Sequence, residues 1–419
     1  MGLRGRPYPR VVMRVAAVKS ALRERNVRLL LASGAADALG NNMAAVALAF
    51  AVLQIGSTAD LGYVFLAREI PMVIFLLAGG VWADRVSRKT LLVAGDLATG
   101  SAQAVTALLF LTHHASVWSV AALQMVFGVA GAFTRPANTG LISQAVSHEH
   151  LQQANALLDL GRSTLRVIGP ALGGLIVVTA NPGWALAVDA SSFFVTAVLQ
   201  FQLRIRPSER PARTRVLHEL REGWSEFTGR TWLWTMVASF GLFQLTLFPA
   251  LLVLGPSVAK AHLGGAGAWG LILGFQGVGS IFGGLSALRL QPRRPLVAAA
   301  LLCVPIAVLL ALLGAAAPVP LLCAAGLVAT WGLTCGDIIW FTTFQLHVPD
   351  HLMSRLSSFD WFGSVALNPI GYALVGPLAN ALGVATTLYV AAALNAAISV
   401  VVAATPAIRG LERAAPVVA

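Results

Sequence analysis

Charged side chains are scarce in this sequence. Asp, Glu, Lys and Arg make up 11% of the 419 residues, and 57% of the residues are hydrophobic. Soluble domains carry about 25% charged residues. One or two soluble cores could not bury this much apolar surface, so most of it must contact lipid. The composition therefore excludes a soluble globular protein and predicts an integral membrane protein.

Cysteine and catalytic motifs are also sparse. Cys303, Cys323 and Cys335 lie in apolar runs without metal-ligand spacing, which is typical of small packing residues. His347 and His351 are four residues apart but lack the glutamate of a zinc-protease helix, and there is no G-x4-G-K-[ST] phosphate loop. We therefore expect no bound metal, no cofactor, no direct use of ATP and no enzyme activity.

Acidic residues are fewer than basic ones: the chain has 17 Asp and Glu and 29 Lys and Arg, which gives a net charge of +12. In a soluble protein this excess would suggest nucleic acid. Basic loops that orient membrane spans explain it better, so we expect lipid and no nucleic acid as partners. No cleavage-site pattern precedes the first apolar run, and residues 1–27 are predicted to form a basic cytoplasmic tail, with a surface helix over 11–22.

Long apolar runs dominate the rest of the chain. A membrane span needs about 20 mostly apolar residues. Twelve runs meet this requirement: 28–53, 60–82, 90–112, 117–138, 158–180, 183–203, 231–255, 267–288, 295–314, 319–343, 357–382 and 384–406. The predicted fold is an all-α integral membrane protein with twelve transmembrane helices.

The runs fall into two halves of six. GGVWADRVSRKTL follows the second run, and the similar GGLSALRLQPRRPL follows the eighth, from Gly283. The predicted domains are an N-terminal half (28–203), a cytoplasmic linker (204–230), a C-terminal half (231–406) and a cytoplasmic tail (407–419). Such parallel repeats are typical of transporters whose binding site lies between the halves.

The distribution of positive charge predicts the orientation. Of 29 Lys and Arg, Lys260 alone falls in a predicted outer connection, while the longer connections on the other side are basic. Basic loops stay in the cytoplasm. Both termini are therefore predicted to be cytoplasmic, as an even number of spans requires.

The stretch GGVWADRVSRK (79–89) resembles the loop 2–3 signature of the major facilitator superfamily, G-x3-D-R-x-G-R-K, with Ser87 in place of the second glycine. With SHEHLQQANALLDLGRS and GPALGGLIV, the chain is most similar to the bacterial branch of enterobactin-exporter-like and macrolide-efflux-like proteins, often labelled transmembrane secretion effectors. The resemblance implies a monomeric, multi-pass transporter of the bacterial cytoplasmic membrane. The matching signature residues are Gly80, Asp84, Arg85, Arg88 and Lys89.

The resemblance implies that this loop is a conformational latch. Asp84 would pair with the start of the eleventh span in one state and release it in another, because an acid is stabilised at a helix N-terminus. Asp96 and Asp360 are acids that Arg85 or Arg88 could meet. The alternative is a topology anchor, and the two roles are compatible.

A second motif lies in the fifth span, where Gly169, Pro170, Gly173 and Gly174 form a GP-x2-GG pattern. It resembles the antiporter signature of the superfamily's drug–proton exporters. That signature has a glycine four residues before Gly169, where this chain has Leu165. The alternative is plain helix packing, because glycines let neighbouring helices approach closely.

Charges inside the spans are costly, about 2.5–3.5 kcal/mol each on insertion scales, so each calls for a partner or a wet cavity. A buried carboxylate can load and release a proton as the cavity alternates sides. The alternative to proton coupling is that these charged residues form permanent pairs between helices. The proton-coupling candidates, in order, are Asp37, Glu69 and Asp337, and further cavity charges are Arg68, Arg166 and Asp189.

Polar and aromatic residues in the spans suggest a cavity for an amphipathic substrate, although such polar residues also bridge helices structurally, for about 0.6 kcal/mol each. The candidates are Asn41, Gln124, Phe127, Gln244, Gln276, Trp331, Trp340 and Phe341. The sequence thus predicts a secondary active exporter that moves a drug-like or siderophore-like molecule outward in exchange for protons. The alternative on the same fold is proton-coupled uptake of a small nutrient.

Overall fold

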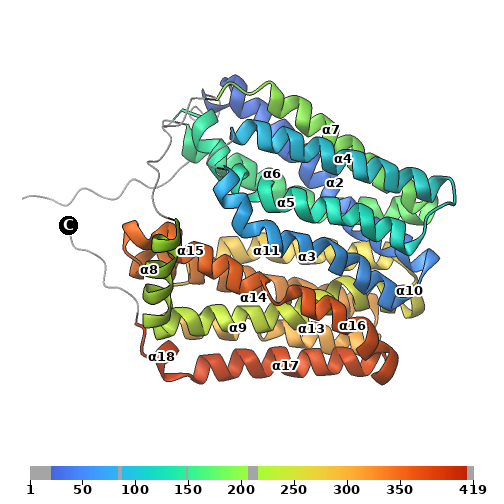
Figure 1. Cartoon of the computed structure of the whole chain (residues 1–419). Coiled ribbons are helices and arrows are strands. Elements are labelled where there is room, and N and C mark those ends of the chain that lie inside the picture. Colours follow the sequence, from blue (N-terminus) through green and yellow to red (C-terminus); the bar gives the residue numbers. More distant parts are fainter. Residues whose placement is uncertain (1–19, 84–86, 148–149, 206–215, 413–419) are drawn as a thin grey trace, which may run out of the picture.

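The computed structural model describes residues 20–83, 87–147, 150–205 and 216–412 (Figure 1). These residues form helices and connections without strands, so the predicted all-α class is confirmed. Ten helical spans are long and apolar enough to cross a membrane. Two more long helices, α3 (Thr58–Ala83) and α6 (Leu151–Thr179), carry three charged residues each and complete the set of twelve.

The N-terminal half packs as one bundle, coloured blue to green in Figure 1. In this bundle α3 packs on α5, α4 packs on α5 and α7, and α2 packs on α6 and α7. Besides α3 and α6, its helices are α2 (Arg25–Ile55), α4 (Arg88–Leu111), α5 (Val117–Ala145) and α7 (Pro182–Phe201).

The C-terminal half follows α8 (Val216–Gly229), which packs on α9 and α15. Its helices are α9 (Thr231–Pro249), η1 (Ala250–Leu254), α10 (Gly255–His262), α11 (Ala266–Ala287), α12 (Pro295–Leu302), α13 (Pro305–Gly314), α14 (Val319–His347), α15 (Asp350–Val365), α16 (Asn368–Leu382), α17 (Val384–Ala404) and α18 (Pro406–Arg409).

Three of these spans are interrupted near a proline, which lacks the N–H of a helical hydrogen bond. Pro305 separates α12 from α13, and Pro369 follows the break between α15 and α16. After Pro249, the chain makes one π-helical turn, in which the Gly255 N–H bonds to the Ala250 carbonyl oxygen. The predicted spans 295–314 and 357–382 are therefore bent at these points, and the seventh runs on to His262.

The bundle has two distinct ends. The basic end carries residues such as Arg25, Lys89, Arg204, Arg230 and Arg409, together with α8 and α18. The short-loop end carries the brief connections 56–57, 112–116, 180–181, 263–265, 315–318 and 383. In Figure 1 the two halves converge at the short-loop end and separate toward the basic end, where α8 lies.

The buried apolar residues follow the same division. At the short-loop end a single cluster, the shared core, joins both halves, with Leu53 and Leu61 in the same cluster as Leu254 and Val375. Toward the basic end, each half has its own cluster. The N-terminal core includes Val27, Leu92, Leu141 and Leu158, and the C-terminal core includes Leu233, Leu296, Trp340 and Leu356.

Contacts between the halves at the short-loop end depend on glycine and on two polar bonds. A Cβ added at Gly376 of α16 would lie 2.5 Å from the Ala59 Cα of α3, so only glycine allows this approach. Thr58 donates a hydrogen bond to Ser257 at 3.0 Å, and Lys260 donates one to the Leu53 carbonyl oxygen. These contacts close the short-loop end.

Candidate functional site

A cavity of about 590 Å³ lies between the two halves, below the shared core. Its N-terminal wall comes from α2, α3, α4, α5 and α7, and its C-terminal wall comes from α9, η1, α14, α15 and α16. Phe65 of α3 and Tyr372 of α16 stack across the halves with ring centroids 5.5 Å apart, next to the shared core. This pair forms the roof of the cavity toward the short-loop end.

Most of the predicted substrate residues line this cavity: Asn41, Gln124, Phe127, Gln244, Trp340 and Phe341. Gln276 and Trp331 lie instead between α11 and α14. The Trp331 indole donates to Ser286 Oγ at 3.0 Å, and Thr330 donates to the Gln276 carbonyl oxygen at 2.8 Å. These two residues therefore hold helices of the C-terminal half together.

Four of the predicted intramembrane charges also face the cavity: Arg68, Glu69, Asp189 and Asp337. The Arg68 guanidinium lies over the Phe127 ring, 5.3 Å from its centroid. Asp189 is completely buried and accepts a hydrogen bond from Gln103 Nε2 at 2.6 Å. The N-terminal wall thus combines both signs of charge with amide partners.

Arg166 lies outside the cavity, where α6 meets α11. It is exposed and donates to Ser280 Oγ on α11 at 3.0 Å. The bond joins one half to the other, so the structure gives Arg166 an interhelical contact where the sequence suggested a cavity charge.

Asp37 and Asp96 share a second, smaller pocket of about 250 Å³ inside the N-terminal half. Arg162 of α6 also lines it. Asn41 lines both pockets, as do Arg68, Met72 and Phe127, and it donates to Asp37 Oδ1 at 2.8 Å, which links Asp37 to the central cavity. Asp37 therefore lies one hydrogen bond away from the substrate cavity.

The latch residues are only partly described. Asp84 and Arg85 lie outside the described residues, and Gly80 lies in the last turn of α3. Ser87 caps α4 by accepting from the Thr90 N–H at 3.1 Å, which explains serine in place of the signature's glycine. Asp360 lines the central cavity. The latch stays a prediction.

Lys89, the last residue of the loop signature, is tied within its own half. It donates to the Leu203 carbonyl oxygen at 3.0 Å and lies 4.9 Å from the Phe201 ring centroid. Arg88 begins α4.

The GP-x2-GG motif brings α6 against two neighbours. A Cβ at Gly173 would lie 2.6 Å from the Met43 carbonyl oxygen of α2, and one at Gly174 would lie 2.6 Å from the Ala266 carbonyl oxygen of α11. The Pro170 carbonyl oxygen meets Gly270 of α11 equally closely, and Gly169 packs on Asn42. The motif therefore forms part of the contact between the halves, and an antiporter role for it stays a prediction.

Sequence reasoning missed several aromatic residues of the cavity, including Phe65, Phe240, Trp361 and Tyr372. They stand in apolar helices that contain many other aromatics, and nothing in their spacing distinguishes the cavity side from the lipid side. Asp360 was predicted as a latch acid near the start of the eleventh span and not as a cavity residue, and its proximity to Trp361 is the one local signal for this part of the wall.

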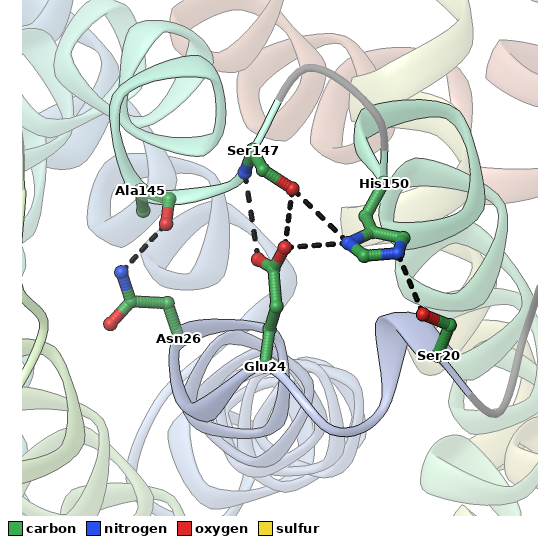
Figure 2. Close-up of polar contacts among 6 residues, drawn as sticks. All are labelled: Ser20, Glu24, Asn26, Ala145, Ser147 and His150. Carbon is green, nitrogen blue, oxygen red and sulfur yellow. Dashed lines mark hydrogen bonds and ion pairs between the residues drawn. The ribbon is translucent and has the colours of Figure 1, made fainter.

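A polar cluster at the basic end lies away from the cavity (Figure 2). Glu24, just before α2, accepts hydrogen bonds from Ser147, and its Oε1 lies 2.6 Å from His150 Nδ1. Ser20 Oγ lies 3.0 Å from His150 Nε2. Hydrogen bonds from Ser147 first, then from His150, lower the pKa of Glu24, although partial burial acts in the other direction. The cluster ties the start of α2 to the connection between α5 and α6.

The sequence is similar to those of two bacterial transporters. The chain is 25% identical over 406 residues to the multidrug efflux pump Tap of Mycobacterium tuberculosis, covering 92% of this chain and 94% of that protein. It is 26% identical over 320 residues to the enterobactin exporter EntS of Shigella flexneri, covering 73% of each.

Solved structures show the same fold at low sequence identity. The nucleoside transporter NupG matches with a TM-score of 0.68 and 13% identity, over 91% of this chain and 98% of that one. A bacterial homologue of the lysosomal transporter Spinster matches with a TM-score of 0.68 and 15% identity, over 94% and 99%.

A sequence profile of the Major Facilitator Superfamily matches residues 30–365. This match, the fold and the central cavity agree with the family resemblance of the loop signature, and the predicted fold of two six-helix repeats is confirmed. The chain belongs to the Major Facilitator Superfamily, and it is a multi-pass membrane protein and a secondary transporter, not an enzyme.

Proposed function

We propose that this protein exports an amphipathic small molecule from the bacterial cytoplasm by alternating access, in exchange for protons. The observation that carries the proposal is the central cavity, which has acidic and aromatic walls and lies below a core shared by both halves. In alternating access the halves rock around such a site and expose it to one side at a time.

The positive charges support an orientation with the basic end in the cytoplasm. Lys260 is the one Lys or Arg of the described residues that lies at the short-loop end. Basic loops remain cytoplasmic. Helix α2 begins at the basic end and α18 ends there. With this orientation the structure corresponds to a state that faces inward, ready to take a substrate from the cytoplasm or the inner leaflet.

The nature of the cargo is supported by the walls and by the relatives. Phe127, Trp340 and Phe341 offer apolar surface, whereas Gln124 and Gln244 offer amide groups. A molecule with an aromatic or aliphatic body and a few polar groups suits this lining. Tap and EntS are named as a multidrug efflux pump and an enterobactin exporter, which favours export over uptake.

Proton coupling is assigned to the carboxylates of the N-terminal half, with Asp37 first. Asp37 shares its pocket with Asp96 and Arg162, and Asn41 connects it to the substrate cavity. A carboxylate in such a pocket can exchange a proton when the halves move, because its contact with water changes. Glu69 and Asp337, which line the cavity itself, are the other candidates.

The test uses everted membrane vesicles that contain a pH-sensitive dye and a panel of amphipathic compounds. The wild type should release protons from acidified vesicles when a transported compound is added, and Asp37→Asn should not. Asp159→Asn, at an exposed position on α6, is the matched control and should behave like the wild type. If no compound moves protons with the wild type, antiport is wrong. If Asp37→Asn retains full coupling, Asp37 is not the coupling acid.

A further inference from the structure

The two walls of the central cavity differ in charge. The N-terminal wall carries Arg68, Glu69 and Asp189, whereas the C-terminal wall carries Asp337 and Asp360. Within the described residues, no Lys or Arg of the C-terminal half lines the cavity. Arg68 lies on the opposite wall, over the Phe127 ring. The charged residues of the C-terminal wall are therefore all acidic.

Asp360 is buried in this wall and is not fully satisfied. Asp360 is 6% exposed and lines the cavity together with Trp340. Its carboxylate oxygen Oδ1 has no hydrogen-bond partner among the described residues. A buried carboxylate oxygen without a partner costs free energy, so the site favours a ligand that brings a positive charge or a donor.

Aromatic rings surround the two acids. Trp340 and Phe341 lie three and four residues after Asp337 on α14, which places them on the same side of the helix. Trp361 follows Asp360 and is half exposed, and Phe240 packs against Trp340 with ring centroids 5.9 Å apart. Carboxylates combined with aromatic faces bind amines and onium groups, through charge attraction and cation–π contact.

Other buried groups of the cavity also lack donors. Gln124 Oε1, Asp189 Oδ1 and Asn368 Oδ1 have no hydrogen-bond partner among the described residues, and all three residues line the cavity. Their exposed fractions are 1%, 0% and 6%. These oxygens can only accept hydrogen bonds, so they match the N–H groups of a protonated amine and not a ligand rich in anionic oxygens.

We propose that the C-terminal wall is the binding site for a positively charged group of the substrate, with Asp360 as the main counter-charge and Asp337 as the second. The substrate class is then an organic amine or onium ion with an apolar body. This inference rests on the proposed function, because it concerns the same cavity. It narrows the cargo from amphipathic molecules in general to cations.

The test is equilibrium binding to the full chain in nanodiscs, with empty nanodiscs subtracted. Two probes of nearly equal size and shape are used, tetraphenylphosphonium and tetraphenylborate, which differ in the sign of their charge. The wild type should bind the phosphonium more tightly than the borate. Asp360→Asn should weaken phosphonium binding by about tenfold or more, as expected when one partner of a desolvated charge pair is removed, and should leave borate binding equal or stronger.

Two variants complete the experiment. Asp159→Asn, which changes an exposed acid of α6 outside the cavity, should bind both probes like the wild type. Trp361→Leu keeps both acids and should weaken phosphonium binding by about threefold to tenfold through loss of a cation–π contact. If Asp360→Asn does not fold, the test uses two other measurements. These are phosphonium binding by Asp337→Asn, which should be weakened, and the preference of the wild type for the phosphonium over the borate.

Equal binding of the two probes by the wild type, or a preference for the borate, would overturn the proposal. So would unchanged phosphonium binding in a folded Asp337→Asn, Asp360→Asn double variant. The binding assay needs no gradient, so it separates the two proposals. If the protein binds the phosphonium but transports nothing, the cation site is supported and the exporter proposal is wrong. If it exports an anion and does not bind the phosphonium, the exporter proposal is supported and the cation site is wrong.

Discussion

The two ends of the bundle hold the chain together in different ways. At the short-loop end the shared core, the close glycine contacts and the bonds of Thr58 and Lys260 join one half to the other. At the basic end the described polar contacts stay within a half, as in the Glu24 cluster, the Lys89 bond to Leu203 and the Arg230 bond to the His347 carbonyl oxygen. The core is likewise split into two at this end.

This difference indicates which contacts break and which persist when the cavity changes sides. In the proposed alternating access the interface at the short-loop end has to open, so we expect those contacts to set the balance between states. The contacts at the basic end keep each half rigid while it moves as a body. Substitutions at the short-loop end should therefore change the equilibrium between conformations, and substitutions at the basic end should change stability.

The largest effect is expected from Gly174→Val. The added Cβ would meet the Ala266 carbonyl oxygen at 2.6 Å, and backbone cannot move aside as a flexible side chain can. Overpacking of this kind costs about 1–3 kcal/mol, so the closed short-loop end should become roughly tenfold less populated and transport should fall with it. The measurement is labelling of a single cysteine placed at the short-loop end.

Gly161→Val is the matched control on the same helix, because nothing lies within 4 Å of a Cβ added there. It should label and transport like the wild type. If both variants behave alike, the close approach of α6 and α11 does not control the conformational balance.

A smaller effect is expected when the two lysine contacts are compared. Lys260→Met removes a bond to the Leu53 carbonyl oxygen of the other half, whereas Lys89→Met removes a bond to Leu203 of its own half. Lys260 is exposed, so the loss should be about 1 kcal/mol. It should shift the distribution of distances between spin labels on the two halves roughly fivefold toward the outward-open state.

Lys89→Met should leave that distance distribution unchanged and lower the unfolding temperature by a few degrees. A clear shift of the distance distribution in Lys89→Met would contradict the view that contacts at the basic end affect stability and not the balance between conformations. It would support the predicted latch in the 79–89 loop instead.

The smallest effect concerns the Glu24 cluster and pH. The pKa of Glu24 in the folded protein is lowered from 4.5, so the charged form stabilises the fold above that pH, and the contribution is lost as pH falls through the lowered value. The wild type should lose up to about 1 kcal/mol more stability than Glu24→Gln between pH 6 and pH 3.5. Thermal unfolding in detergent measures this difference.

Glu226→Gln is the control for this pH experiment. Glu226 is 44% exposed and pairs at 3.3 Å with Arg230, which lies between α8 and α9, and an exposed ion pair of this kind contributes little. Its unfolding temperature should follow that of the wild type at every pH. A Glu24→Gln protein with the same acid sensitivity as the wild type would show that the cluster contributes nothing to stability.

Much of the fold could be predicted from the sequence because lipid imposes a simple rule on composition. The twelve apolar runs coincide with the twelve long helical spans, since each span must satisfy its backbone internally. The boundaries were less accurate. The fifth span was predicted from residue 158, whereas α6 begins at Leu151, because a helix that leaves the lipid can continue through polar residues such as Gln153 and Asn155.

The site was harder to predict, because it depends on the rotation of each helix and on how the halves meet. Asp337 was recognised as an intramembrane acid, and the structure brings it to the same wall as Asp360. Trp331 and Gln276 were expected in the cavity, but their helices are turned so that both face a neighbouring helix. Neither composition nor spacing distinguishes a lipid-facing aromatic from Phe240 or Tyr372.

The π-helical turn at Ala250–Leu254 has a consequence for the tolerance of this gene to insertions and deletions. An i→i+5 turn contains one residue more than an α-helical turn, and each residue of a helix turns the side chains that follow by about 100°. Ser257 and Lys260 come directly after this turn and reach the other half. Deletion of one codon here would keep a span of ample length and hydrophobicity, yet it would turn both side chains away from their partners. A deletion that leaves the hydropathy of the span unchanged would thus remove the polar contacts that join the two halves at the short-loop end.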